Sequence, residues 1–213
     1  MKACLPPGGE LIVCDNNSTD ATPRIAEEEG AAVMFEPHNQ ISRARNAGAR
    51  AAAGDWLLFI DADSVLHPGT LEDLLLCAKA GSVVGGGCLV ALDRVPKRYI
   101  PVVESWNLCS RFFRVAAGSF VFCRADAFRE VGGFSEELYA GEELELSRAL
   151  KRWGRRKGLD FVILTRHPHV SSGRKAYLYT GREMLGILWR ALSSPLRVLR
   201  AREMLPLFYD GRR

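Results

Sequence analysis

Two carboxylates one residue apart follow an apolar run at residues 56–60, and this is the strongest chemical signal in the sequence: Trp-Leu-Leu-Phe-Ile, then Asp61, Ala62 and Asp63. Such a run predicts a strand buried on both faces of an α/β sheet. The C-terminal ends of these strands border the crevice where open α/β sheets bind ligands. Two acids this close repel unless a cation or ligand donors offset their charge. Mg²⁺ and Mn²⁺ bind carboxylates together with substrate phosphates, which favours a metal site; a simple turn is the alternative.

Further polar residues stand at the ends of other expected elements. Asp15 ends a short apolar strand and begins a polar loop, and Glu142 and Glu143 open an expected helix whose dipole they complement. Arg43 and Arg45 lie in an Ala-rich stretch, where they suit either phosphate oxygens or ordinary surface ion pairs.

The elements that must position these residues alternate along the first part of the chain. Strands are expected at residues 10–15, 31–35 and 56–60, with helices between them, one over 43–53 that Ser42 caps, and one opening at Pro68. This alternation predicts a parallel sheet covered by helices. The next expected element is a glycine-led strand at 85–91, which is also a weak candidate for a phosphate-binding loop. After it we expect a helix at 98–114, a strand at 117–123, a short helix at 124–128, a helix at 141–150 and a strand at 161–164.

Composition limits the class of protein. The 213 residues, 47% of them hydrophobic, suffice for one sizeable globular α/β domain. The sequence has no apolar stretch long enough to span a bilayer, no signal peptide and no paired cysteine motif, so a cytoplasmic location is expected. Residues 1–150 hold 14 Lys and Arg against 21 Asp and Glu, whereas residues 151–213 hold 15 against 4. The basic end predicts an anionic partner or a solvated basic face.

Three stretches together resemble the inverting, nucleotide-sugar-dependent glycosyltransferases of family 2. They are 13–20 (Val-Cys-Asp-Asn-Asn-Ser-Thr-Asp), 42–63 with its Ala-Arg-Asn-x-Gly helix and Asp-x-Asp strand, and 133–148 with Gly-Phe and Gly-Glu-Glu. The resemblance implies a GT-A fold, an α/β architecture with a mixed, mainly parallel sheet covered by helices. The family's first strand and helix have no counterpart here, so we expect a truncated reading frame. Residues 1–165 would form the domain, and residues 166–213 a basic amphipathic extension.

The resemblance also implies roles for individual residues. Asp63 would bind Mn²⁺ or Mg²⁺, helped by a histidine after the last strand, His169 or His167, although a polar surface loop is the commoner reading of that segment. Asp61 would bind the ribose or the metal's shell, and Asp15 the base of the nucleotide. Arg43 or Arg45 would meet the diphosphate, as would Arg174 or Lys175.

On the acceptor side, the resemblance makes Glu143 the base that deprotonates the acceptor hydroxyl, and Glu142 a residue that orients the acceptor or caps the helix. The family usually has Asp at the position of Glu143. The partners expected are a nucleoside-diphosphate sugar and an acceptor whose class, lipid-linked, saccharide or small molecule, stays open; nucleic acid is not expected. The amphipathic stretch from Met184 to Arg202 would contact the inner face of a membrane, or pack on the main domain or a second subunit.

Two alternatives remain at the level of sequence. A truncated transferase domain would bind nucleotide or a partner without turnover. Residues 59–65 also resemble the nucleophile loop of haloacid-dehalogenase-type phosphatases, in which Asp61 would be phosphorylated and Asp63 would act as acid and base.

Overall fold

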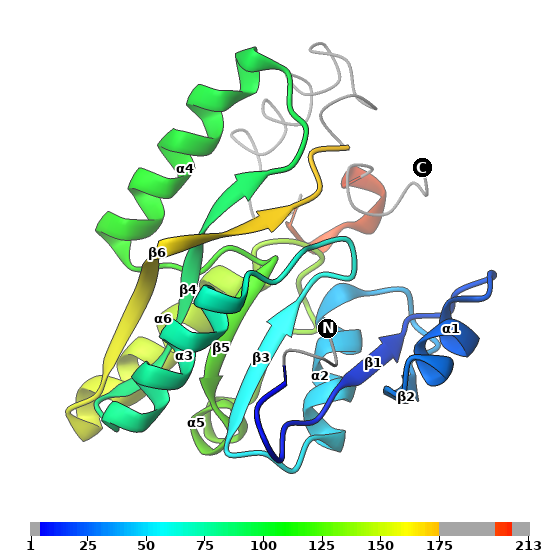
Figure 1. The fold of residues 1–213 in the computed structure, drawn as a ribbon, viewed down its shortest axis with the longest axis horizontal. Coiled ribbons are helices and arrows are strands. Elements are labelled where there is room, and N and C mark those ends of the chain that lie inside the picture. Colours follow the sequence, from blue (N-terminus) through cyan, green and yellow to red (C-terminus); the bar gives the residue numbers. More distant parts are fainter. Residues whose placement is uncertain (1–4, 175–198, 206–213) are drawn as a thin grey trace.

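The computed structural model describes residues 5–174 and 199–205. Its strands are β1 (Ile12–Asp15), β2 (Ala32–Phe35), β3 (Trp56–Ile60), β4 (Val83–Leu92), β5 (Phe120–Arg124) and β6 (Asp160–Ser171). Its α-helices are α1 (Thr22–Glu28), α2 (Ile41–Ala51), α3 (Pro68–Ala80), α4 (Ile100–Phe113), α5 (Ala125–Val131) and α6 (Glu142–Lys157), with short 3₁₀ turns η2 (Lys97–Tyr99) and η3 (Arg202–Met204). The predicted order of elements is confirmed (Figure 1).

The described strands form two sheets. The larger has the order β3-β5-β4-β6, in which β5 is antiparallel to both neighbours and β4 is parallel to β6. Three of its four strands therefore run in one direction, which confirms the mixed, mainly parallel α/β fold. Within the described residues β1 is the first strand, and it pairs in parallel with β2 as a separate two-stranded sheet.

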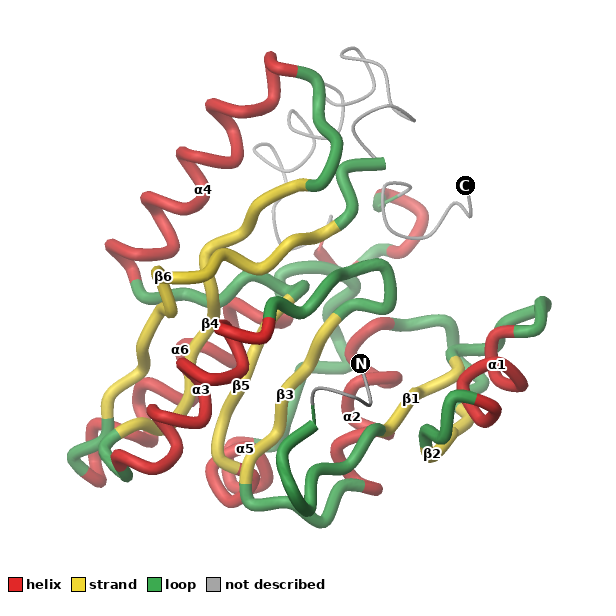
Figure 2. The backbone as a smooth tube through the Cα atoms, viewed as in Figure 1, coloured by secondary structure: helices red, strands yellow, loops and turns green. Residues whose placement is uncertain are grey.

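Helices cover both faces of the larger sheet (Figure 2). Side chains alternate across β5, so Val121 and Cys123 join one core cluster, with residues of α5 and α6, while Phe120 and Phe122 join the other, with Leu74 of α3. The first cluster also contains Phe59 and Phe134, whose rings meet edge to face at 4.9 Å between centroids. The strand end that carries Asp61 is therefore held by packing on both sides of the sheet.

The glycines of β4 have a different role from the expected one. Gly85, Gly86 and Gly87 lie inside a buried strand, not at a flexible entrance or in a phosphate loop. A Cβ on Gly85 would meet the carbonyl oxygen of Phe122 at 2.5 Å, and one on Gly86 would collide with the carbonyl oxygen of Val162. Glycine is needed at positions 85 and 86 because the neighbouring backbones of β5 and β6 approach too closely for any side chain.

Strand β6 is much longer than the predicted 161–164, and it carries His167 and His169 into the sheet. The expectation of a polar surface loop is wrong, because β4 is long enough to pair with this segment: Val90 lies opposite His169 and Leu92 opposite Ser171. The pairing is irregular between Leu164 and His169, where Pro168 lacks a backbone N–H. The strand also continues across residue 165, where the sequence placed a domain boundary.

Helix α2 begins earlier than predicted. Gln40, in extended conformation, is its N-cap, so Ser42 lies inside the helix, and its buried hydroxyl has no hydrogen-bond partner among the described residues. The helix ends at Ala51, before Gly54. Lys175 and the stretch from Met184 to Arg197, for which membrane or subunit contact was predicted, lie outside the described residues. No helix in the described ranges has the length and apolarity to cross a bilayer.

Candidate active site

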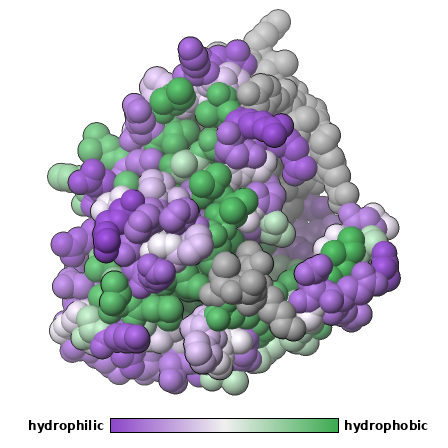
Figure 3. Space-filling model, viewed as in Figure 1, coloured by the Kyte–Doolittle hydropathy of each residue, from purple (hydrophilic) through white to green (hydrophobic). Residues whose placement is uncertain are grey.

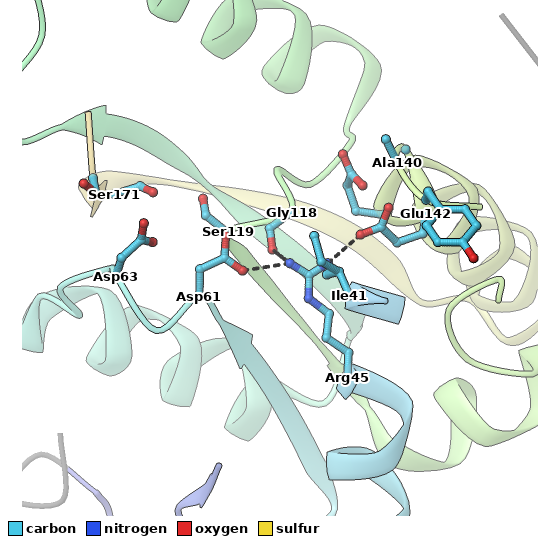
Figure 4. A pocket seen from close by; sticks show the side chains of 13 residues that line it. Ile41, Arg45, Asp61, Asp63, Gly118, Ser119, Ala140, Glu142 and Ser171 are labelled. Carbon is cyan, nitrogen blue, oxygen red and sulfur yellow. Dashed lines mark hydrogen bonds and ion pairs between the residues drawn. The ribbon is translucent and has the colours of Figure 1, made fainter. Parts of the chain in front are cut away.

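A cavity of about 260 Å³ opens where β3 ends, and four acidic side chains line it. Asp61 and Asp63 follow β3 on one side, while Glu142 and Glu143 start α6 on the other (Figure 4). The sequence-predicted carboxylates of two motifs some eighty residues apart are thus brought together in one pocket. The remaining lining residues are Ile41, Arg45, Gly118, Ser119, Tyr139, Ala140, Gly141, Ser171 and Ser172.

Arg45 of α2 joins the two acidic pairs. Its guanidinium donates to Asp61 Oδ1 at 2.9 Å, to Glu142 Oε1 at 3.0 Å and to the carbonyl oxygen of Gly118 at 2.6 Å. The side chain is only 11% exposed, and that of Glu142 only 5%. A guanidinium offers several donors in a fixed plane, so one residue can hold both sides of the pocket in register.

Other polar side chains of α2 fix the loop that leads into α6. Asn46 donates to the carbonyl oxygen of Phe134 at 2.9 Å and accepts from its N–H at 3.0 Å. Gln40 donates to the carbonyl oxygens of Glu136 and Leu138 at 2.8 and 2.9 Å. Gln40 and the Asn46 of the Ala-Arg-Asn motif therefore hold the loop that leads to Glu142 and Glu143.

Glu143 is in an environment that opposes its charge. The pKa of Glu143 is raised to about 7, chiefly by burial and then by the carboxylates of Glu142 and Asp61. Its own backbone N–H and Arg45 act in the opposite direction and lower the pKa. Its carboxyl carbon lies near Gly118, where a Cβ would be 3.6 Å away. A carboxyl that titrates close to neutrality in a pocket is suited to accept and release protons.

Asp61 and Asp63 are in a wetter environment, with side chains 43% and 42% exposed. In the loop behind them Ser64 N–H donates to the Asp61 carbonyl at 3.1 Å, and Val65 N–H donates to the Val170 carbonyl of β6 at 2.9 Å. Arg174 comes within 3.9 Å of Asp63. The acids thus keep oxygens open to the cavity.

His169 is completely buried beside this loop, and neither of its ring nitrogens has a hydrogen-bond partner among the described residues. Burial lowers the pKa of His169, although the carboxylates of Asp61 and Asp63 act in the opposite direction. A neutral imidazole with free nitrogens and carboxylate oxygens fits a divalent cation. The described residues contain no group of three or more His, Cys, Asp or Glu side chains placed to hold a metal ion together.

The other predicted residues, the buried His169 among them, do not line the cavity. Asp15 is buried at the end of β1, where it accepts from Ser18 N–H at 3.1 Å. Arg43 pairs with Glu136 at 3.0 Å, and His167 lies 3.2 Å from Asp73 Oδ2. Arg45 is therefore the predicted arginine that reaches the cavity.

Sequence reasoning did not identify Gly118, Ser119, Tyr139, Ser171 and Ser172 as lining residues. Gly118 and Ser119 directly precede β5, whose antiparallel place beside β3 is not evident from the sequence. The available signal was the pair of glycine-containing turns before β5 and α6. Because β5 pairs with β3, the turn before β5 lies beside the end of β3 and lines the cavity.

Known proteins resemble this chain in sequence and in fold. The model of the family described as Glycosyl transferase family 2 matches residues 6–125. The pre-mycofactocin glycosyltransferase of Mycobacterium tuberculosis is 29% identical over 225 residues, which cover 96% of this chain and 46% of that protein. The chain thus spans about half the length of this curated relative.

Two solved structures share the fold. The mannosyltransferase PcManGT from Pyrobaculum calidifontis, in complex with GDP-Man and Mn²⁺, has a TM-score of 0.59 at 18% identity, covering 94% of this chain and 59% of that one. Glucosyl-3-phosphoglycerate synthase from Mycobacterium tuberculosis, in complex with Mn²⁺, UDP and glucosyl-3-phosphoglycerate, has a TM-score of 0.58 at 17% identity, covering 92% and 72%. The fold is thus of the GT-A type, and the phosphatase alternative is set aside. The chain belongs to glycosyl transferase family 2.

Proposed function

We propose that this chain transfers a sugar from a nucleoside-diphosphate sugar to an acceptor hydroxyl with inversion at the anomeric carbon. The observation that carries the proposal is the position of two unlike acidic pairs across one cavity. The half-exposed pair Asp61 and Asp63 suits the charged diphosphate end of a donor, while Glu143, whose pKa is raised by burial, suits proton removal from an acceptor.

The donor would lie along the ends of β1 and β3. Asp15 would hydrogen-bond the base, Asp61 the ribose or the metal's shell, and Asp63 and His169 would hold Mn²⁺ or Mg²⁺. A bound divalent cation would offset the negative charge of the diphosphate as it leaves. The structures of relatives with GDP-Man or UDP and Mn²⁺ support this donor class.

Glu143 would take the proton of the acceptor hydroxyl as that oxygen attacks the anomeric carbon, and the nucleoside diphosphate would leave from the opposite face of the sugar. A base with a pKa of about 7 is largely ionised just above neutral pH yet basic enough to accept the proton. Glu142 cannot serve equally well, because its carboxylate is held by Arg45. Glu142 and Arg45 would instead keep Glu143 aimed into the cavity.

The experiment is a screen of nucleoside-diphosphate sugars by thermal shift and by release of nucleoside diphosphate, with and without Mn²⁺. We expect one donor to stabilise the chain in the presence of Mn²⁺, and its turnover to require an acceptor. Glu145→Gln is the matched control for Glu143→Gln, because Glu145 is exposed in the same first turn of α6. Equal loss of turnover in both variants would contradict the role of Glu143.

A second candidate function is binding of nucleotide without turnover. It is favoured by the pairing of β1, which carries Asp15, with β2 alone and not with β3 within the described residues. Under this alternative the donor would bind, and Mn²⁺ would strengthen binding, but no acceptor would yield free nucleoside diphosphate. Measured turnover that Glu143→Gln abolishes would rule it out.

A further inference from the structure

Helix α4 has one face without a partner in the described part of the chain. Val102, Leu108, Cys109, Phe112 and Phe113 recur at helical spacing, and all are exposed, Phe112 to 79% and Leu108 to 67%. Figure 1 shows α4 at the edge of the molecule far from β1 and β2. A cluster of exposed aromatic and aliphatic side chains on one helix face marks an interaction surface, because scattered exposure does not align in this way.

The opposite face of α4 is fixed to the sheet. Asn107 donates to the Val90 carbonyl and accepts from its N–H, both at 2.9 Å, and Ser110 is completely buried with its hydroxyl on the Val115 carbonyl. The apolar face is therefore presented by a firmly anchored helix, and residues 114–117 lead from it directly to Gly118 and Ser119 of the cavity.

Basic residues border this face at both ends. Lys97 and Arg98 precede the helix, Arg111 and Arg114 stand in and after its last turn, and all four are exposed. Glu104 is the only acid between residues 97 and 114. Figure 3 shows apolar and hydrophilic side chains side by side over this region. Phenylalanine and leucine on one face with lysine and arginine at the borders are the features of helices that lie in the interface of an anionic membrane.

We propose that α4 docks this protein on an anionic lipid surface, with Leu108, Phe112 and Phe113 entering the boundary between head groups and acyl chains and with Lys97, Arg98 and Arg111 on the lipid phosphates. A second copy of the chain fits the face less well. Two α4 helices packed in either direction would bring basic ends against basic ends, and like charges at an interface are unfavourable.

The test is sedimentation of the 213-residue chain with vesicles of phosphatidylcholine, alone or with phosphatidylglycerol. We expect binding to the anionic vesicles that weakens as salt rises. The double change Leu108→Ser and Phe112→Ser should weaken it about tenfold or more, because both side chains lose their transfer out of water. Leu76→Ser is the control, since Leu76 is 59% exposed on α3, a different helix.

Charge is tested separately with Lys97→Gln and Arg98→Gln, which should weaken binding to anionic vesicles while circular dichroism stays that of the wild type. Three results would overturn the proposal. The first is that the wild type does not bind the anionic vesicles, and the second is that the Leu108 and Phe112 double variant binds them as well as the wild type does. The third is that light scattering shows a wild-type dimer which the double variant loses, while its vesicle binding is unchanged. The second result would place the lipid contact elsewhere in the chain, and the third would assign the face to a second copy. None of these readouts depends on sugar transfer.

Discussion

The two acidic pairs of the cavity differ in almost everything except charge. Asp61 and Asp63 are separated by one residue at the end of a strand, and more than two fifths of each side chain is exposed. Glu142 and Glu143 are adjacent at the start of a helix, where Glu142 is buried and burial raises the pKa of Glu143 to about 7. The comparison teaches that the environment, not the residue type, makes the pairs different, and under the proposed function it would assign charge binding to one and proton transfer to the other.

Arg45 contacts one member of each pair, so the difference between them is maintained by a shared cation. Arg45 forms an ion pair with Glu142, whereas the pKa of Glu143 is raised chiefly by its burial. The following changes test this division in order of expected effect.

Glu143→Gln should have the largest effect. Removing the base is expected to lower transfer about 10³-fold, with donor affinity nearly unchanged, because the amide keeps the shape but cannot accept the proton. Single-turnover transfer and donor titration measure the two quantities. Glu145→Gln should retain wild-type rates. A parallel loss of donor affinity would show that Glu143 also binds the donor, and would remove the distinction between the pairs.

Asp63→Asn should act on the other side of the cavity. We expect turnover to fall about 10²-fold at fixed Mn²⁺ and to recover partly as Mn²⁺ is raised, because an amide oxygen is a weaker ligand than a carboxylate. Asp55→Asn, an exposed change before β3, is the control. A loss that is independent of Mn²⁺ would count against a metal role for Asp63.

Arg45→Met should affect both acidic pairs, because Arg45 contacts a member of each. The change leaves Glu142 buried without its cation, which is expected to cost about 3 kcal/mol of unfolding free energy. Turnover should fall about tenfold through misplacement of Glu143. Because Arg45 lowers the pKa of Glu143, the acidic limb of the pH–rate profile should move to higher pH. Arg50→Met, in the last turn of the same helix, should leave the profile in place.

The smallest effect is on stability. Glu143 binds its proton more tightly folded than unfolded, so its burial lowers stability as pH rises from about 4.5 to about 7, and the penalty is constant above that. Glu143→Gln removes this penalty and should raise the unfolding free energy by about 2 kcal/mol at pH 8. The difference should vanish near pH 4, where both states are protonated. Urea unfolding at the two pH values measures it, and equal gains at both would mean that packing, not charge, is responsible.

The order of elements could be predicted from the sequence, and four of the acids that it singled out line one cavity, for reasons that are local. Apolar runs ending in Asp15 or Asp61 and acids opening α6 are patterns within a few residues. The features it missed depend on distant pairing. His169 reads as a loop residue, and only the length of β4 brings it into the sheet. Gly85 reads as the start of a glycine-led strand or a phosphate loop, and only the neighbouring Phe122 carbonyl shows why it has no side chain.

The hydrogen bonds from Gln40 and Asn46 to residues 134–138 have a consequence for protein engineering. Under the proposed function the segment before α6 would face the acceptor, and such segments are the natural pieces to exchange between relatives when a new acceptor is sought. In this chain the segment before α6 is held by a helix nearly a hundred residues away in sequence. A chimera that exchanges residues 133–141 alone would break those bonds, so α2 and this segment form a single unit of exchange.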